Sequence, residues 1–275
     1  MTISGFLPQR WRATPAAARH AEAIAGVLHT PPLEPDSAGP AIVTLLGTAE
    51  VLPYLVAIKS LRHSLGRGGI AVIDDGTLTG EDRAILAHHC GDPEIVPHRA
   101  VPRGPFPPGG GWALLLTLLD RRAGQYGIAL DPRTVTLGDL PEASAAIAGN
   151  RSFALVGQAA AGGPARHIQR RVAVLCGTRG WRYRPGCGGL AGFAAGGSGR
   201  ALAAAFQAEL TTLGENASAD MARDVVLANE TEPVLLPRSR YGDSAANGAV
   251  FVHCPAGDDD AYIAASQRAI AALVA

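Results

Sequence analysis

Two short apolar runs in this chain end abruptly on acidic residues. Val72 and Ile73 lead into Asp74 and Asp75, and a second run at positions 126–130 leads into Asp131. The carboxyl ends of parallel strands share one edge of a sheet, where open α/β sheets bind ligands. Carboxylates there accept hydrogen bonds from a ribose or bind a divalent ion that bridges a diphosphate. We therefore expect both strand ends to converge on one ligand, the alternative being that each aspartate only caps a turn or helix.

The second strand end departs from a metal site. Asp131 is followed by Pro132 and then by Arg133, which carries a permanent positive charge. A metal ion that bridges two phosphates needs acidic or neutral ligands instead. Two interpretations stay open: Arg133 neutralises phosphate in a metal-independent site, or the site has lost its chemistry.

The composition excludes several classes of protein. The 275 residues are 47% hydrophobic and 17% charged, and 24 basic residues balance 24 acidic ones. This balance provides no field that would steer the chain onto nucleic acid or an anionic membrane. In segment 1–12 the arginines follow the apolar patch, which is the wrong order for a signal peptide. The most apolar stretch, 41–58, is interrupted by Gly47, Glu50 and Pro53, which argues against a membrane-spanning helix. We expect a cytoplasmic protein without a membrane span and without a nucleic-acid partner.

Strands and helices are expected to alternate along the chain. The apolar patterns predict strands at 41–46, 69–73, 94–98, 126–130, 153–157, 171–176 and 249–253, and helices at 16–28, 51–65, 80–89, 112–123, 199–213, 218–227 and 260–274. Thr79 is the expected N-cap of the third helix, with Asp82 in a capping-box position. Alternation implies right-handed crossovers. The predicted fold is α/β, with a mainly parallel, mixed, twisted sheet and helices on both faces.

Four segments together resemble the GT-A type nucleotide-sugar glycosyltransferases, in the order and spacing of that family. Positions 42–47 and 55–61 look like its opening strand and helix. Asp74-Asp75-Gly76-Thr77 is similar to its Asp-Asp-Gly-Ser turn, and Asp131-Pro132-Arg133 resembles its Asp-x-Asp motif with the second acid replaced. Positions 250–257 resemble its Phe-x-His-Phe-x-Gly segment. The resemblance covers about residues 41–257.

The resemblance implies a role for each matched residue. Asp74 and Asp75 would contact the nucleoside, Asp131 the ribose or a weakly held Mn²⁺ or Mg²⁺ ion, and Arg133 the diphosphate. His253 would complete the metal site with Asp131. A hydrogen-bonded core histidine is the equally weighted alternative for His253, and with one carboxylate and one histidine no tight metal binding is expected.

Two glycines and one aspartate complete the candidate site. Gly188 and Gly189 lie in a glycine-rich segment, 181–193, that looks like the family's acceptor-side strand and turn, where backbone comes close to a sugar or diphosphate. The alternative is a tight turn packed on the core. The family's Glu-Gln pair is missing at Ala219-Asp220, so Asp220 is a weak candidate base, with Glu215 and Asp224 beside it. The favoured alternative makes Asp220 and Asp224 an ordinary solvated helix face.

The first hypothesis is transfer of a sugar from a nucleotide-diphosphate donor to an unknown acceptor. Its domain boundaries would be 1–40 for an N-terminal helix and linker and 41–275 for one domain, with a nucleotide-binding half, 41–148, and an acceptor-side half, 149–275. The second is a catalytically degenerate relative that serves as a binding or scaffold protein. A nucleotide-dependent oxidoreductase is disfavoured because the first strand lacks a Gly-x-Gly-x-x-Gly turn.

Overall fold

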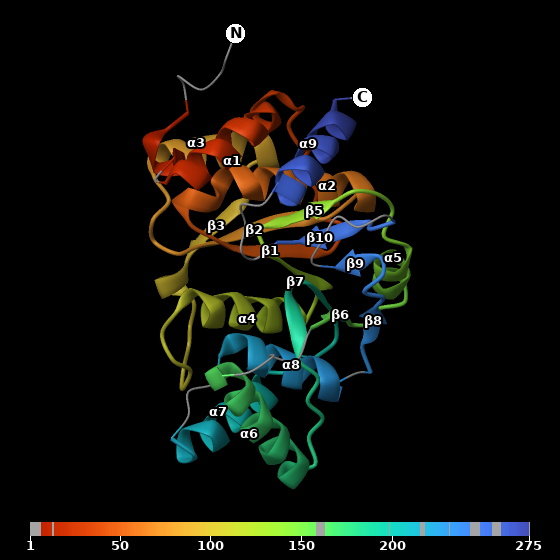
Figure 1. Cartoon of the computed structure of the whole chain (residues 1–275). Coiled ribbons are helices and arrows are strands. Elements are labelled where there is room, and N and C mark those ends of the chain that lie inside the picture. Colours follow the sequence, from red (N-terminus) through yellow and green to blue (C-terminus); the bar gives the residue numbers. More distant parts are fainter. Residues whose placement is uncertain are drawn as a thin grey trace.

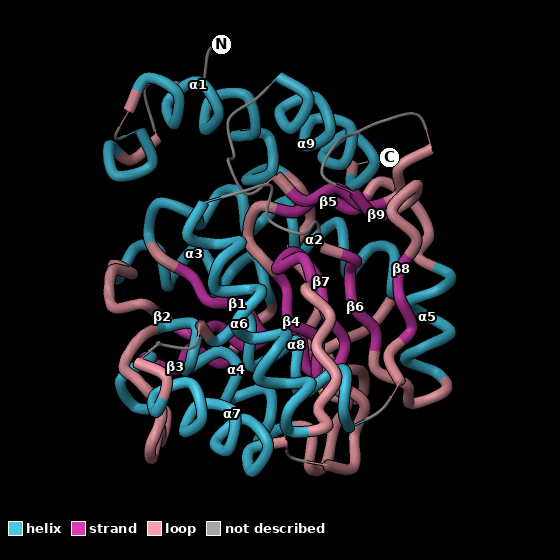
Figure 2. Tube along the Cα trace, turned by 60° about the horizontal axis from the view of Figure 1, so that its bottom comes forward, coloured by secondary structure: helices cyan, strands magenta, loops and turns pink. Residues whose placement is uncertain are grey.

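The central element is a seven-stranded sheet with the order β3-β2-β1-β4-β7-β6-β8 (Figures 1 and 2). The computed structural model describes residues 7–12, 14–157, 163–197, 199–214, 218–230, 232–242, 248–254 and 260–274. The strands of this sheet are β1 (Ala41–Leu46), β2 (Gly69–Asp74), β3 (Glu94–Pro97), β4 (Gly127–Leu130), β6 (Phe153–Val156), β7 (Gly186–Phe193) and β8 (Val234–Leu236). Strands β3, β2, β1 and β4 are parallel, whereas β7 runs antiparallel to both β4 and β6. The sheet is therefore mixed, and the predicted fold class is confirmed.

A second, three-stranded sheet lies beside the end of β4. Its order is β5-β10-β9, and its strands are β5 (Thr134–Thr136), β9 (Tyr241–Gly242) and β10 (Phe251–His253). Strand β10 pairs antiparallel with β5, so that His253 lies opposite Thr134. This pairing brings the last strand of the chain next to the turn that follows β4.

Helices cover both faces of the main sheet (Figure 1). The α-helices are α1 (Pro15–Ile24), α2 (Val51–Leu65), α3 (Gly80–Cys90), α4 (Gly110–Arg121), α5 (Pro141–Ala148), α6 (Gly163–Arg179), α7 (Arg200–Thr212), α8 (Ala219–Glu230) and α9 (Asp260–Leu273), and short 3₁₀ helices are η2 (Gln9–Arg12), η3 (Ala25–His29), η4 (Thr48–Glu50) and η5 (His98–Ala100). Helix α3 begins with the predicted capping box, in which Thr79 and Asp82 exchange side-chain and backbone hydrogen bonds.

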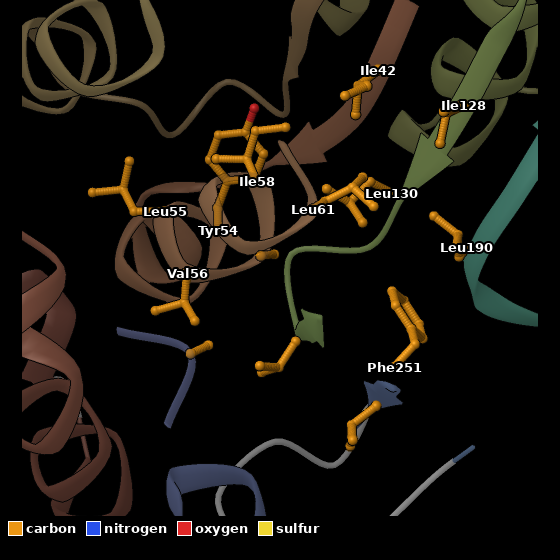
Figure 3. Close-up of a cluster of buried hydrophobic side chains, with 14 of the residues drawn as sticks. Ile42, Tyr54, Leu55, Val56, Ile58, Leu61, Ile128, Leu130, Leu190 and Phe251 are labelled. Atoms are coloured by element: carbon orange, nitrogen blue, oxygen red, sulfur yellow. The ribbon is translucent and has the colours of Figure 1, made fainter. Parts of the chain in front are cut away.

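Alternating strand residues divide the core into two clusters. Ile42 of β1 faces the cluster formed with α1, α2, α3 and α9, whereas Val43 faces the cluster formed with α4, α6, α7 and α8. Figure 3 shows side chains of α2, including Ile58 and Leu61, against those of β1 and β4, with Leu190 of β7 and Phe251 of β10 completing the cluster. The side chains that Figure 3 labels are at most 2% exposed, and each contributes about 1.5–3 kcal/mol to folding on full burial.

The strand predicted at 171–176 is wrong, because these residues lie inside helix α6. Val172, Leu175 and Cys176 are buried, whereas Val174 between them is 70% exposed. Burial thus follows the helical period, and a run of apolar residues concealed it.

The predicted N-terminal helix is also shorter than expected. Helix α1 ends at Ile24, and the chain continues as the 3₁₀ helix η3 to His29. Within the described part of the chain, no helix combines the length and the apolarity that crossing a membrane requires. The predicted domain boundaries stay predictions.

Candidate active site

The candidate site lies at the carboxyl end of β1, β2 and β4, beyond which η4 carries an acidic residue that the sequence analysis overlooked. Glu50 ends η4 and directly precedes α2, four positions after the last residue of β1. It is two-thirds buried by its side chain, at 33% exposure. The reasoning from strand ends that singled out Asp74 and Asp131 applies equally to this residue. The signal was therefore present in the sequence, although an intervening helical turn obscured it.

The two aspartates at the end of β2 have different surroundings. Asp74 is buried, accepts hydrogen bonds from the backbone amides of Gly76 (2.8 Å) and Leu78 (3.3 Å), and is ion-paired with Arg83. Asp75 is exposed and accepts from both the amide and the hydroxyl of Thr77, at 2.9 and 2.7 Å. Both therefore shape the turn, as the capping alternative predicted, and only Asp75 is also accessible to a ligand.

The turn after β4 presents Asp131 and Arg133 side by side. Asp131 Oδ1 accepts from the Arg133 amide at 2.8 Å, and the hydroxyl of Thr134 donates to the Asp131 carbonyl at 2.8 Å. This local bonding is a typical aspartate-led turn. These bonds use the backbone of Arg133 and not its side chain. The side chain instead reaches Glu50, with Arg133 Nε 3.3 Å from Glu50 Oε1.

The charges around Glu50 are close enough to affect its ionisation. Burial raises the pKa of the Glu50 carboxyl, Arg133 partly offsets this effect, and the negative charges of Asp131 and Asp75 raise the pKa further. Glu50 thus experiences the acids of two separate strand ends at once. The predicted convergence of Asp75 and Asp131 on one edge is consistent with this shared influence.

A cavity of about 340 Å³ opens beside these residues. Its polar lining consists of Glu50, Asp131, Asp220 and Arg223. Its apolar wall is built from β1, α4, β4 and the start of α8, through Leu45, Leu114, Leu115, Leu118, Ala129, Leu130 and Ala219. Arg133 lies next to this lining, through its contact with Glu50, rather than in it.

Both predicted glycines lie in β7, but they face different neighbours. Gly188 is exposed and lines the cavity. Gly189 is buried, and a Cβ added there would lie 2.6 Å from Cγ of His253. The carbonyl of Gly189 also accepts from the Asp131 amide at 3.0 Å. Gly189 therefore permits the close approach of β7, β10 and the turn after β4.

His253 is buried at 4% exposure, with its Nε2 3.7 Å from Asp131 Oδ1. The structure thus brings together the two residues that were predicted to share a metal. Within the described residues, however, no group of three His, Cys, Asp or Glu side chains could hold an ion. With Arg133 two positions from Asp131, the donor set does not fit a tightly bound divalent metal.

Helix α8 contributes a charged chain of three side chains. Arg223 donates to Asp220 at 2.8 Å and to Asp224 at 2.9 and 3.1 Å. Asp220 is 74% exposed by its side chain, whereas Asp224 is only 7% exposed and accepts from the Gly186 amide at 2.8 Å. Burial raises the pKa of Asp224, and the positive charge of Arg223 and the hydrogen bond from the Gly186 amide partly offset this increase. The solvated-face interpretation is therefore wrong for Asp224, and Glu215 lies outside the described residues.

The fold matches a known class of structures. The seven-stranded, mainly parallel, mixed sheet with its antiparallel β7 and its covering helices matches the fold of GT-A glycosyltransferases. No protein-family model matches the chain, and no curated protein matches it.

Solved structures carry this assignment of the fold. The chain is similar to the bifunctional glycosyltransferase WbbM in its apo form, with 14% identity and a TM-score of 0.57 over 87% of this chain and 51% of that one. It is similar to the galactosyltransferase LgtC, solved with donor and acceptor sugar analogs, with 13% identity and a TM-score of 0.55 over 85% of this chain and 95% of that one. The chain thus spans about half of WbbM and nearly all of LgtC. At these identities the likeness establishes the fold.

Proposed function

We propose that this protein transfers a sugar from a nucleotide-diphosphate donor, with Arg133 in place of a metal ion at the diphosphate. The observation that carries the proposal is the position of Arg133, which lies two residues after Asp131 and is bonded to Glu50 in the cavity wall. The GT-A fold of LgtC, a galactosyltransferase solved with donor and acceptor analogs, supports the reaction class.

The geometry of Arg133 suits a phosphate ligand. Its Nε is the atom that reaches Glu50, and among the described residues its two terminal amino groups have no hydrogen-bond partner. Two parallel N–H groups are the arrangement that binds phosphate oxygens in a bidentate manner. Glu50 would therefore hold the guanidinium in position while its outer edge faces the diphosphate.

The proposed reaction needs charge neutralisation and a proton acceptor. The bond between the anomeric carbon and the diphosphate oxygen breaks, and negative charge develops on the leaving group beside Arg133. The acceptor hydroxyl forms the new bond to the anomeric carbon and loses its proton. Asp220 lines the cavity and remains the predicted base for that proton. Asp75 and Asp131 would bind the nucleoside and the ribose through their carboxylate oxygens.

A binding or scaffold protein is the second candidate, and one observation favours it. The two guanidinium groups nearest the cavity already have protein carboxylates as partners, Arg133 with Glu50 and Arg223 with Asp220 and Asp224. Ion pairs of this kind are also what a site without a ligand would retain.

Titration with nucleoside diphosphates, followed by thermal unfolding with and without Mn²⁺, separates the two candidates. For the enzyme, we expect stabilisation without Mn²⁺ that is lost in Arg133→Ala and kept in Arg268→Ala, an exposed arginine of α9 that serves as the charge-matched control. Stabilisation that requires Mn²⁺ and survives Arg133→Ala would contradict the role of Arg133. No response to any nucleotide would favour the scaffold.

A further inference from the structure

Positive charge is concentrated in one part of the chain. Segment 143–208 contains eight of the 24 basic residues and none of the 24 acidic ones, so the other 209 residues carry 16 basic residues against 24 acidic ones. The overall balance of the chain conceals this division. Electrostatic attraction depends on where charges lie as well as on their sum, so a surface built from this segment has a field of its own.

The structure places five of these arginines on helix α6 and on the segment directly after it. Figure 1 shows α6 at the end of the molecule opposite to α1 and α9. The exposed Arg166 and Arg170 lie four positions apart, on one face of the helix. In the following segment exposed arginines alternate with the partly buried Trp181 and Tyr183. We call this set the arginine surface, and its members are Arg166, Arg170, Arg179, Arg182 and Arg184.

Three arginines of this surface have no carboxylate partner among the described residues. Arg179 is paired with Glu209 of α7, whereas Arg170, Arg182 and Arg184 form no such ion pair within the part of the chain that the structure describes. A guanidinium keeps its charge at every ordinary pH. Three permanent positive charges are therefore exposed here for an anionic partner.

Exposed apolar side chains lie among these arginines. Val174 is 70% exposed and lies four positions after Arg170, on the same face of α6. Leu213, which follows α7, is 43% exposed, and its carbonyl accepts a hydrogen bond from Arg171 of α6 at 3.1 Å. The surface thus combines permanent positive charge with apolar groups whose burial in a partner is favourable.

This combination discriminates between the anionic partners of an arginine surface. The backbone of a nucleic acid supplies phosphates but leaves the exposed valine and leucine without an apolar partner. An anionic bilayer supplies phosphates in its headgroups and an apolar region at the boundary of the acyl chains. The stems of the arginine side chains also suit this boundary, because they are apolar while their charged ends remain at the phosphates.

We propose that the arginine surface docks this protein on an anionic lipid bilayer, with Arg170, Arg182 and Arg184 at the headgroups and Val174 at the boundary of the acyl chains. The binding is peripheral, since none of the described helices has the length and the apolarity to cross a membrane. It does not depend on the transfer reaction, because these four residues lie outside the lining of the candidate site.

Co-sedimentation of the whole chain with lipid vesicles tests the docking. One vesicle contains equal parts of phosphatidylglycerol and phosphatidylcholine, and the other contains phosphatidylcholine alone. We expect binding to the anionic vesicle only, and release when the salt is raised from about 0.1 M to about 1 M, because the Debye length shortens from about 10 Å to about 3 Å. Equal binding to the two vesicles, or no binding to the anionic one, would overturn the proposal.

Paired arginine variants locate the contact. The double variant Arg170→Gln, Arg182→Gln should bind the anionic vesicle about 25-fold more weakly, because each basic residue near such a surface contributes about fivefold. The matched control is Arg67→Gln with Arg268→Gln, which removes the same charge from exposed positions after α2 and in α9. The control should retain the affinity of the wild type. An equal loss in the two double variants would mean attraction by net charge alone and would overturn the arginine surface.

A second pair of variants separates the bilayer from a nucleic acid. Val174→Ser should weaken vesicle binding several-fold, whereas Val274→Ser, at another exposed valine, should not. Thermal unfolding of every variant confirms that it is folded. A short DNA duplex is titrated in parallel. Duplex binding that the double variant Arg170→Gln, Arg182→Gln abolishes and that Val174→Ser leaves unchanged would assign the surface to nucleic acid and overturn the bilayer.

Nucleoside diphosphates titrated in the same preparations keep this inference separate from the proposed function. Vesicle binding without a nucleotide response sustains the arginine surface and removes the support for the transferase. A nucleotide response without vesicle binding does the reverse.

Discussion

Replacing Gly189 by alanine tests whether the junction of β7, β10 and the turn after β4 is as tight as the structure shows. The new Cβ would lie 2.6 Å from Cγ and 2.7 Å from Cβ of His253. Carbon atoms in contact prefer about 3.5–4.0 Å, so one side must move by about 1 Å. His253 is buried and lies in strand β10, so the movement cannot be confined to a flexible side-chain end.

The neighbouring glycine provides a matched control. Among the described residues, a Cβ added at Gly188 would have one neighbour within 4 Å, Nη1 of Arg223 at 3.9 Å, which is ordinary van der Waals contact. Both glycines belong to β7, and neither has a positive φ angle. The two alanine variants therefore share the change in chain entropy and differ in the contact with His253.

The expected cost follows from overpacking. Forcing extra carbon into a well-packed region costs about 1–3 kcal/mol, against which a Gly→Ala change gains about 0.4–1 kcal/mol from the unfolded state. We expect Gly189→Ala to reduce the free energy of unfolding by about 1–2 kcal/mol. Gly188→Ala should be neutral or slightly stabilising.

Urea denaturation of both variants, followed by circular dichroism, measures these free energies. NMR signals of the His253 ring should shift in Gly189→Ala and stay in place in Gly188→Ala. If Gly189→Ala were as stable as Gly188→Ala and left the His253 signals unchanged, the reasoning about this junction would be refuted.

Two further predictions concern buried ionisable groups. Lys59 Nζ lies 3.2 Å from Nδ1 of His89. Burial of the His89 ring, and to a smaller extent the positive charge of Lys59, lowers the pKa of His89 to about 4. Because His89 binds its proton more tightly in the unfolded chain, its contribution to the free energy of unfolding is complete above about pH 6.5 and falls by at most about 3 kcal/mol as the pH is lowered to 4. Urea midpoints measured across this range should show the loss in the wild type and a flatter pH profile in His89→Gln. Identical pH profiles for the two proteins would contradict the lowered pKa of His89. Arg223→Met leaves the buried Asp224 carboxylate without its guanidinium and should lower the free energy of unfolding, measured by urea denaturation, by about 3–5 kcal/mol. Asp220→Asn changes an exposed partner of the same arginine and should lower it by less than about 1 kcal/mol. Equal decreases in the two variants would disprove the buried ion pair.

Local rules accounted for most of the elements, since a strand or a helix end depends on residues close in the sequence. The capping box at Thr79 and Asp82 is an example, because both of its hydrogen bonds join residues three positions apart. The same rules failed at 171–176, where the residues are apolar and β-branched enough for a strand. Tertiary packing decided for helix α6 there, because it buries Val172 in the cluster formed with α4, α7 and α8 and leaves Val174 exposed.

The sequence by itself determined that acidic residues end β2 and β4, and that Arg133 follows Asp131, since both depend on neighbouring positions. The tertiary structure decided what those residues meet. Glu50 and Arg133 are 83 positions apart, and only the parallel pairing of β1 with β4 brings them together. The burial of Asp224 was likewise invisible in the sequence, because helical spacing does not show which face of α8 is covered. Charge compensation in this cavity is therefore a property of the fold, since it depends on contacts between distant segments.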